Sequence, residues 1–123
     1  MSNKRTGPVP PGTVEKLEER SLGMCEGMCG KRAREIHHRR FLGRGGKHNV
    51  SNLLALCGRG NHSGCHGIAH QGEAPDGWAI SRHEPKHESE IPYVDLAGRT
   101  WWLDDEGGRH DRPQDTGRSE GNG

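Results

Sequence analysis

Two pairs of cysteines constrain the fold of this chain more than any other sequence feature. Cys25 and Cys29 are separated by three residues, and Cys57 and Cys65 by seven. Only 28% of the residues are apolar, and there are 20 glycines and 7 prolines, so a hydrophobic core alone offsets little of the entropy lost on folding. Close pairs of thiols are typical of a tetrahedral structural zinc ion, whose binding adds folding free energy. We therefore expect the four cysteines to hold Zn²⁺.

The spacing of the second cysteine pair leaves the ligand set open. Zinc sites usually place about two to four residues between paired ligands, and the gap between Cys57 and Cys65 is wider. His62 lies inside this gap and is an alternative ligand in place of either cysteine. The remaining alternative is four unrelated thiols, each buried or free.

The cysteines are expected to be reduced. Residues 1–20 contain no apolar run, so no signal peptide is predicted. The longest apolar stretch, 53–56, is far shorter than the ~20 residues of a membrane-spanning helix. We expect a cytoplasmic protein with no membrane segment, in which cysteine binds metal rather than forming disulfides.

The charge of the chain is unevenly distributed, although its net value is only +1. Residues 31–47 contain seven basic residues and one glutamate, a balance of +6, and residues 84–106 contain seven acidic and two basic residues, a balance of −5. A dense basic segment favours binding to a polyanion such as nucleic acid, because neutralised phosphates release counterions. The alternative is a solvated basic face. The residues expected to contact DNA phosphates are Arg39, Arg40, Arg44 and Lys47.

A histidine-rich stretch in the middle of the chain has an order that suits metal-dependent hydrolysis. His37 and His38 are adjacent on a predicted strand, Asn52 follows a glycine-rich loop, and His66 and His70 are one turn apart on a predicted helix. Adjacent residues of a strand point to opposite faces, so one histidine can bind a metal while the other takes a proton from water. Four other histidines lie in polar surroundings and are expected to be solvated: His48, His83, His87 and His110.

These residues resemble the HNH endonucleases of the ββα-metal type, in particular the small phage-encoded kind. The resemblance covers about residues 22–70 and is closest over residues 43–57, the glycine-rich loop and the strand that ends at a cysteine. The later Asp-Gly-Trp and Trp-Trp-Leu-Asp-Asp segments are similar, less specifically, to the β extension of such phage proteins.

The resemblance implies a role for each matching residue. His38 matches the general base, His37 and His66 match ligands of the catalytic cation, and Asn52 matches the residue that braces the loop holding the base. His70 is similar to an additional histidine of colicin-like nucleases, which places it at the metal or at a phosphate. The implied activity is hydrolysis of DNA with Mg²⁺, Mn²⁺ or Ni²⁺, leaving 5′-phosphate and 3′-hydroxyl ends. A terminase subunit or another packaging protein is the implied partner.

The fold class predicted from these patterns is α+β. We expect a ββα-metal core held by zinc over residues 13–72, with a short helix that starts at Thr13, and a small β extension over residues 73–106. Strands are predicted at 78–81, 91–95 and 100–104. Residues 1–12 and 107–123 are expected to be disordered, because they are polar and rich in proline or glycine.

Two functions fit the sequence. The first is a metal-dependent DNA endonuclease, and the second is a non-catalytic, zinc-stabilised module that binds DNA or assists packaging through the same basic segment. The two differ in whether His38 is needed for turnover or is only a packed side chain.

Overall fold

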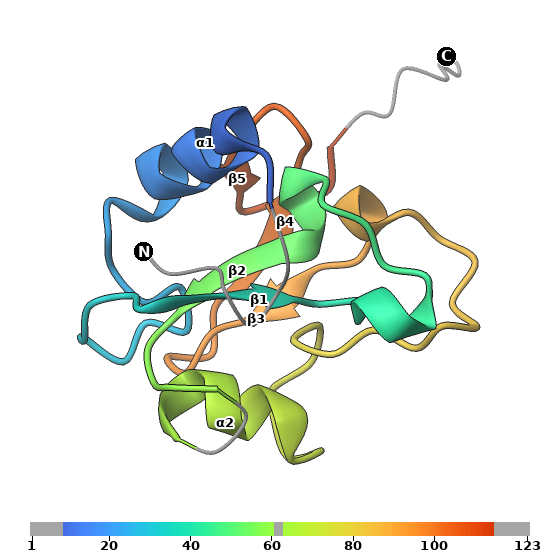
Figure 1. The fold of residues 1–123 in the computed structure, drawn as a ribbon. Helices are drawn as coiled ribbons and strands as arrows, with labels where there is room; N and C mark the ends of the chain where they lie inside the picture. The colour runs from blue at the N-terminus through green and yellow to red at the C-terminus, as the bar shows by residue number, and fades with distance from the viewer. Residues whose placement is uncertain (1–8, 61–62, 115–123) are drawn as a thin grey trace.

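The computed structural model describes residues 9–60 and 63–114. Within these residues, two helices and two small antiparallel sheets form a mixed α+β fold, as predicted (Figure 1). None of these helices is long and apolar enough to cross a membrane. The elements, in chain order, are α1 (Pro11–Ser21), β1 (Glu35–His38), β2 (Leu53–Leu56), α2 (Gly64–His70), β3 (Tyr93–Val94), β4 (Thr100–Leu103) and β5 (Arg109–His110).

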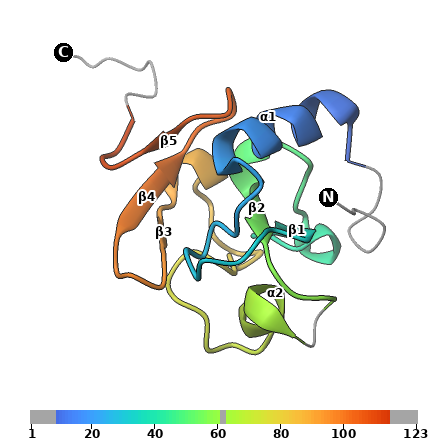
Figure 2. The same ribbon diagram turned by 90° about the vertical axis from the view of Figure 1, so that its left-hand side faces the viewer.

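The antiparallel strands β1 and β2 form the centre of the fold, with α1 on one side and α2 on the other (Figures 1 and 2). Leu53 and Ala55 pack with Leu17 of α1, whereas Leu54 and Leu56 pack in the cluster that contains the cysteines and Trp78. Strand β2 is therefore buried on both faces, which explains why it is a continuous apolar run and does not alternate.

The register of the two strands separates the adjacent histidines. His37 pairs with Leu54 and His38 with Leu53. Directly paired residues of an antiparallel ladder share a face, so His37 lies on the face of β2 that packs toward the cysteine cluster, and His38 lies on the opposite face. The division of the two side chains expected from the sequence is present.

Helix α1 begins earlier than predicted. It starts at Pro11, which suits the first turn of a helix because the missing N–H would have no intrahelical partner. Val9, only 5% exposed, packs in the same apolar cluster as Leu17. The prediction of disorder over residues 1–12 is therefore wrong for residues 9–12, and its remainder lies outside the described residues.

The C-terminal part forms the predicted β extension, with different strand limits. Strands β3, β4 and β5 form one antiparallel sheet, and Trp78 and Tyr93 are fully buried against it and the cysteine cluster. The predicted strand 78–81 is wrong, because this segment makes one backbone–backbone hydrogen bond to the end of β1, from the N–H of Ile80 to the carbonyl oxygen of Arg39, and forms no ladder. Disorder from residue 107 is also wrong, since β5 pairs with β4 and His110 bonds the Asp104 carboxylate at 2.6 Å. Residues 115–123 lie outside the described part.

Two candidate metal sites

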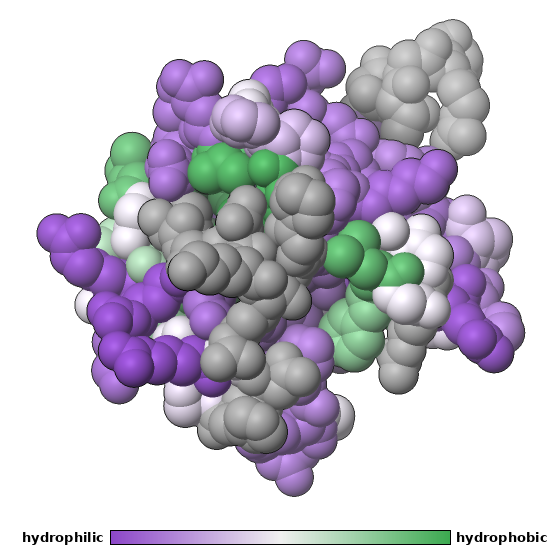
Figure 3. All heavy atoms as spheres, viewed as in Figure 1, coloured by the Kyte–Doolittle hydropathy of each residue, from purple (hydrophilic) through white to green (hydrophobic). Residues whose placement is uncertain are grey.

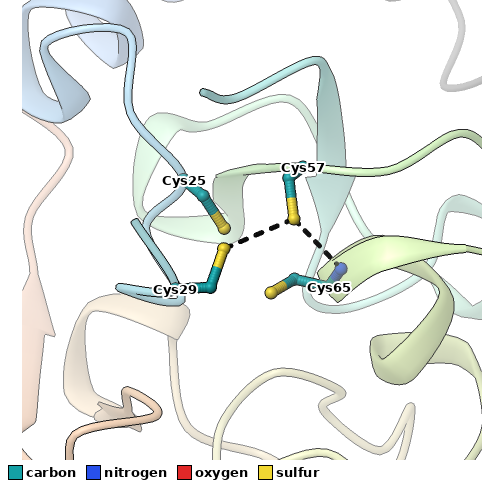
Figure 4. Close-up of side chains that lie close together, drawn as sticks. All are labelled: Cys25, Cys29, Cys57 and Cys65. Atoms are coloured by element: carbon teal, nitrogen blue, oxygen red, sulfur yellow. Dashed lines mark hydrogen bonds between the residues drawn. The ribbon is translucent and has the colours of Figure 1, made fainter. Parts of the chain in front are cut away.

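The four cysteines come together, as predicted. One sulfur from each of Cys25, Cys29, Cys57 and Cys65 lies within 4.8 Å of the other three, and none forms a disulfide. Figure 4 shows their side chains gathered from the turn before β1, the end of β2 and the start of α2. The sulfurs of Cys29 and Cys57 are 3.5 Å apart, and the backbone N–H of Cys65 donates to the Cys57 sulfur at 3.3 Å. This cluster can hold a metal ion.

Backbone closure between Gly58 and Gly64 explains how the wide cysteine pair meets. Both glycines have positive φ, and a Cβ at Gly58 would lie 2.0 Å from the carbonyl oxygen of Ser63. Only glycine permits this approach, which brings Cys57 and Cys65 together despite the seven residues between them. His62, the alternative ligand, lies outside the described residues.

The thiols also influence one another's ionisation. A hydrogen bond from the Cys65 thiol lowers the pKa of Cys25 to about 5, against a smaller opposing effect of burial. The same bond raises the pKa of Cys65, and burial raises the pKa of Cys29. The lowered pKa of Cys25 favours its thiolate, which is the form that binds metals.

A second cluster joins β1 to α2. One ring nitrogen from each of His37, His66 and His70 lies within 4.8 Å of the other two. His37 and His66 are buried and His70 is half-buried. The structure thus brings together all three histidines that the sequence assigned to a catalytic cation.

Hydrogen bonds fix the tautomers of two of these histidines. Nε2 of His37 lies 2.6 Å from the carbonyl oxygen of Trp78, so this nitrogen must carry the proton, and the buried Nδ1 has no hydrogen-bond partner. Nδ1 of His66 donates to the Glu35 carboxylate at 2.9 Å, which leaves its Nε2 as the acceptor. A histidine that donates one N–H to a carboxylate or carbonyl while its other nitrogen faces the centre is the usual arrangement around a bound metal. The orphaned Nδ1 of His37 fits a cation there.

His37 is neutral at physiological pH. Burial, with smaller contributions from the neighbouring His66 and His70, lowers the pKa of His37 to about 3. A neutral imidazole is the form that binds metals. Phe41 closes the cluster, with its ring stacked on His70 at 4.7 Å and set edge-on to His37 at 5.9 Å. No sequence signal marked Phe41, which is simply the residue that follows the basic pair.

His38 lies outside this cluster and contacts another histidine. Its Nε2 is 3.0 Å from Nδ1 of His48, and burial, together with the charge of His48, lowers its pKa to about 4. His38 is thus a neutral imidazole next to the histidine cluster in sequence. The expectation that His48 is solvated is wrong, because its ring is half-buried and paired. The sequence contains no sign of the pair of His38 and His48, because only the path of the loop between them brings the two residues together.

Asn52 holds the loop that follows the two histidines. Its side chain is fully buried, and its Oδ1 accepts from the backbone N–H of Arg40 at 2.7 Å. Its Nδ2 donates to the carbonyl oxygens of Lys47 at 2.9 Å and Arg40 at 3.1 Å. One amide therefore clamps both ends of the loop between residues 40 and 47.

The basic residues next to His38 are not placed to bind phosphate. Arg39 is fully buried and donates to the backbone carbonyls of Gly77, Ser51, Glu88 and Ile91. Arg40 is also buried; it pairs with the Glu88 carboxylate at 2.6 Å and donates to three further carbonyls between residues 81 and 86.

The prediction that Arg39 and Arg40 contact DNA is corrected by these bonds. Their guanidinium groups hold an irregular loop that has no ladder to satisfy its carbonyls. Lys47 is exposed, and the side chain of Arg44 lies outside the described part of the structure.

Comparisons with known proteins identify no relative. No family model matches the chain, and no curated protein or solved structure is similar enough to it to indicate a relationship. The proposal for the function therefore rests on the two clusters of this molecule and on the resemblance described in the sequence analysis.

Proposed function

We propose that this protein is a metal-dependent DNA endonuclease that hydrolyses phosphodiester bonds. The observation that carries the proposal is the cluster in which one ring nitrogen from each of His37, His66 and His70 lies within 4.8 Å of the other two. The buried Nδ1 of His37 has no hydrogen-bond partner, which supports a cation there. The adjacent His38 is neutral and lies on the other face of the strand. A cation site beside a neutral imidazole supplies the two parts that metal-dependent hydrolysis requires.

Each residue has a distinct role in the proposed reaction. His37, His66 and His70 would hold the cation, with Glu35 orienting the His66 ring through Nδ1. When bound, a divalent cation such as Mg²⁺, Mn²⁺ or Ni²⁺ supplies positive charge against the charge that develops on the phosphate and the leaving 3′ oxygen. His38 takes the proton of the attacking water, and His48 and Asn52 fix the ring and the loop beside it.

The cysteine cluster would serve the fold. Four soft thiolates suit Zn²⁺, which would join the turn before β1 to the end of β2 and the start of α2. The resemblance to phage enzymes extends the proposal to the cytoplasm of a bacterial host and to DNA processing or packaging, with a terminase subunit as a candidate partner.

The test is cleavage of supercoiled plasmid by the purified protein with Mg²⁺, Mn²⁺ or Ni²⁺ added. We expect His38→Ala to reduce the rate by roughly 10²- to 10⁴-fold, the usual contribution of a general base, while metal content and melting temperature are retained. The exposed His83→Ala variant is the matched control and should cleave like the wild type. Equal rates for wild type and His38→Ala would contradict the assignment of the base.

One contact favours the second candidate, a non-catalytic zinc-stabilised DNA-binding or packaging accessory module. Nε2 of His38 is already engaged by His48 at 3.0 Å, as in a pair that serves packing alone. This candidate predicts unchanged DNA affinity in His38→Ala and no cleavage with any cation by folded, metal-loaded wild type.

A further inference from the structure

A cavity of about 430 Å³ lies between the segment that enters β1 and the loop that joins β2 to α2. Four of the side chains that line it are cationic, and none is acidic: Lys31, Arg32, Arg34 and Arg59. The remaining lining residues are small, Cys57, Gly58, Ser63 and Gly64. We call this the basic cavity. The side of the molecule over the loop before β1 is strongly hydrophilic in the space-filling view (Figure 3).

The four cations of the basic cavity differ from the three buried arginines of the fold. All four are exposed, and within the described part of the chain none of them forms an ion pair. Arg20, in contrast, is buried against Glu26 at 2.7 Å, and Arg39 and Arg40 are fully engaged by backbone carbonyls and Glu88. The basic cavity therefore gathers four cations that are available to an external anion.

The backbone on both sides of the basic cavity is fixed. The N–H of Arg34 donates to the carbonyl oxygen of Leu56 at 2.8 Å, which continues the ladder between β1 and β2. The N–H of Arg59 donates to the Ser63 hydroxyl oxygen at 2.9 Å. Cations on a fixed backbone present their charge to a ligand without ordering the chain first, which lowers the entropic cost of binding.

Glu35 connects the basic cavity to the histidine cluster. It follows Arg34 directly, and its Oε1 accepts both from Nδ1 of His66 and from the backbone N–H of Gly60, in the loop that forms one wall of the cavity. A strand held in the cavity would therefore be positioned relative to the histidines through a short chain of direct contacts.

We propose that the basic cavity binds the sugar-phosphate backbone of the DNA next to the position that is cut. This inference rests on the proposed function for the identity of the substrate. Phosphates are the anions that a row of exposed, unpaired lysine and arginine side chains recognises without reading sequence. The basic cavity thus takes over the role that the sequence assigned to Arg39 and Arg40.

A different role for the same cations is to balance the negative charge of the cysteine cluster. Cys57 lines the basic cavity, and four thiolates around a divalent ion carry a net negative charge. The two roles predict different effects. Cations that balance the thiolates govern metal content, whereas cations that bind DNA govern the salt dependence of its affinity.

The experiment compares two double variants that each remove two exposed arginines. Arg34→Ala/Arg59→Ala changes the basic cavity, and Arg82→Ala/Arg112→Ala is the matched control, because both of its residues are exposed and neither lines the cavity. Affinity for a short labelled duplex is measured by fluorescence anisotropy over a range of salt concentrations, with no divalent cation added and the duplex checked for integrity afterwards. Bound zinc, melting temperature and cation-dependent plasmid cleavage are measured on the same preparations.

We expect the cavity variant to lower the slope of log affinity against log salt by roughly two, about one for each phosphate that is no longer neutralised, with zinc content and melting temperature retained. The control should keep the wild-type slope. An unchanged slope in the cavity variant overturns the inference, as does a loss of zinc at unchanged slope. If the wild type cleaves plasmid while the cavity variant keeps the full slope, the nuclease proposal stands and the cavity proposal falls. If the cavity variant lowers the slope but the wild type does not cleave plasmid, the cavity proposal stands and the nuclease proposal falls.

Discussion

The two clusters of metal-binding side chains use similar ligand spacing but differ in their surroundings. The cysteines belong to the main apolar cluster, with Leu54, Leu56 and Trp78, and they join three separate segments of the chain. The histidines join only β1 and α2, and one of them, His70, is half-buried beneath Phe41. A metal in the cysteine cluster would hold the fold together, whereas a metal in the histidine cluster would be accessible to a ligand. The two sites differ in ligand number and connectivity more than in burial, and a site with three protein ligands keeps a position open for a further ligand.

The largest expected effect comes from breaking the cysteine site. Cys25→Ser should abolish zinc binding and cooperative unfolding, because structural zinc contributes about 10 kcal/mol or more in small domains, comparable to the whole stability of such a fold. Metal content by colorimetric assay and thermal unfolding by circular dichroism test this. A variant that keeps its metal and its melting temperature would refute the structural role.

Breaking the histidine site should leave the fold in place. We expect His66→Ala to lose binding of a second divalent cation, measured by calorimetric titration of the zinc-loaded protein, and to lose cleavage with it, since the remaining ligands no longer surround the ion. Its melting temperature should fall by only a few degrees, as for the removal of one or two hydrogen bonds. Global unfolding of this variant would remove the distinction between the two sites.

A smaller effect is expected at the residue that orients His66. Glu35→Gln keeps the size of the side chain but removes the charge that His66 faces. Removal of such a partner typically weakens metal affinity by about 10- to 100-fold, so the cation concentration needed for half-maximal cleavage should rise by that factor. The exposed Glu73→Gln serves as the control. Equal cation requirements in the two variants would show that Glu35 has no part in metal binding.

Acid should destabilise the metal-free histidine site gradually. The pKa values of His37 and His38 lie at about 3 and about 4 in the fold, below the ordinary value of 6.5. Unfolded histidines take up protons below about pH 6.5 while the folded ones stay neutral, so their contribution to stability is complete above that pH and is lost as the pH falls toward the folded pKa values.

The expected loss is about 1.4 kcal/mol per pH unit for each histidine. Urea unfolding between neutral pH and about pH 5 measures it, and His38→Gln should flatten the dependence by one histidine's share. If the free energy of unfolding depends on pH equally in His38→Gln and the wild type, the lowered pKa of His38 is contradicted.

The sequence predicted the ligand clusters better than it predicted the role of charge. Cysteine spacing anticipated the first cluster because ligand types and their spacing are local properties. The histidine cluster was anticipated through the resemblance to the HNH endonucleases, which implied its three ligands. The arginines could not be sorted in this way. Arg34 and Arg39 look alike in a charge count, yet one is exposed in the basic cavity and the other is fully buried. The burial of a side chain depends on tertiary contacts. Arg39 is held by the carbonyls of Gly77 and Glu88, which lie 38 and 49 residues further along the chain.

The distinction between local signals and tertiary contacts also applies to the C-terminal β extension. The strand limits at 100–103 follow from β-branched and aromatic residues, but β5 depends on pairing with β4 and on the bond between His110 and Asp104. A glycine-rich polar segment carries no local signal for such pairing.

The close approach of Gly58 and Gly64 makes the two cysteines beside them independent of the chain between them. Because Gly58 and Gly64 lie directly against each other, we expect Cys57 and Cys65 to keep their positions when the length of the segment between these glycines changes. Insertion of a peptide tag between Gly60 and Ser63 should therefore leave both metal clusters assembled. A sequence pattern with a variable gap at this point would find related chains that a fixed cysteine spacing excludes.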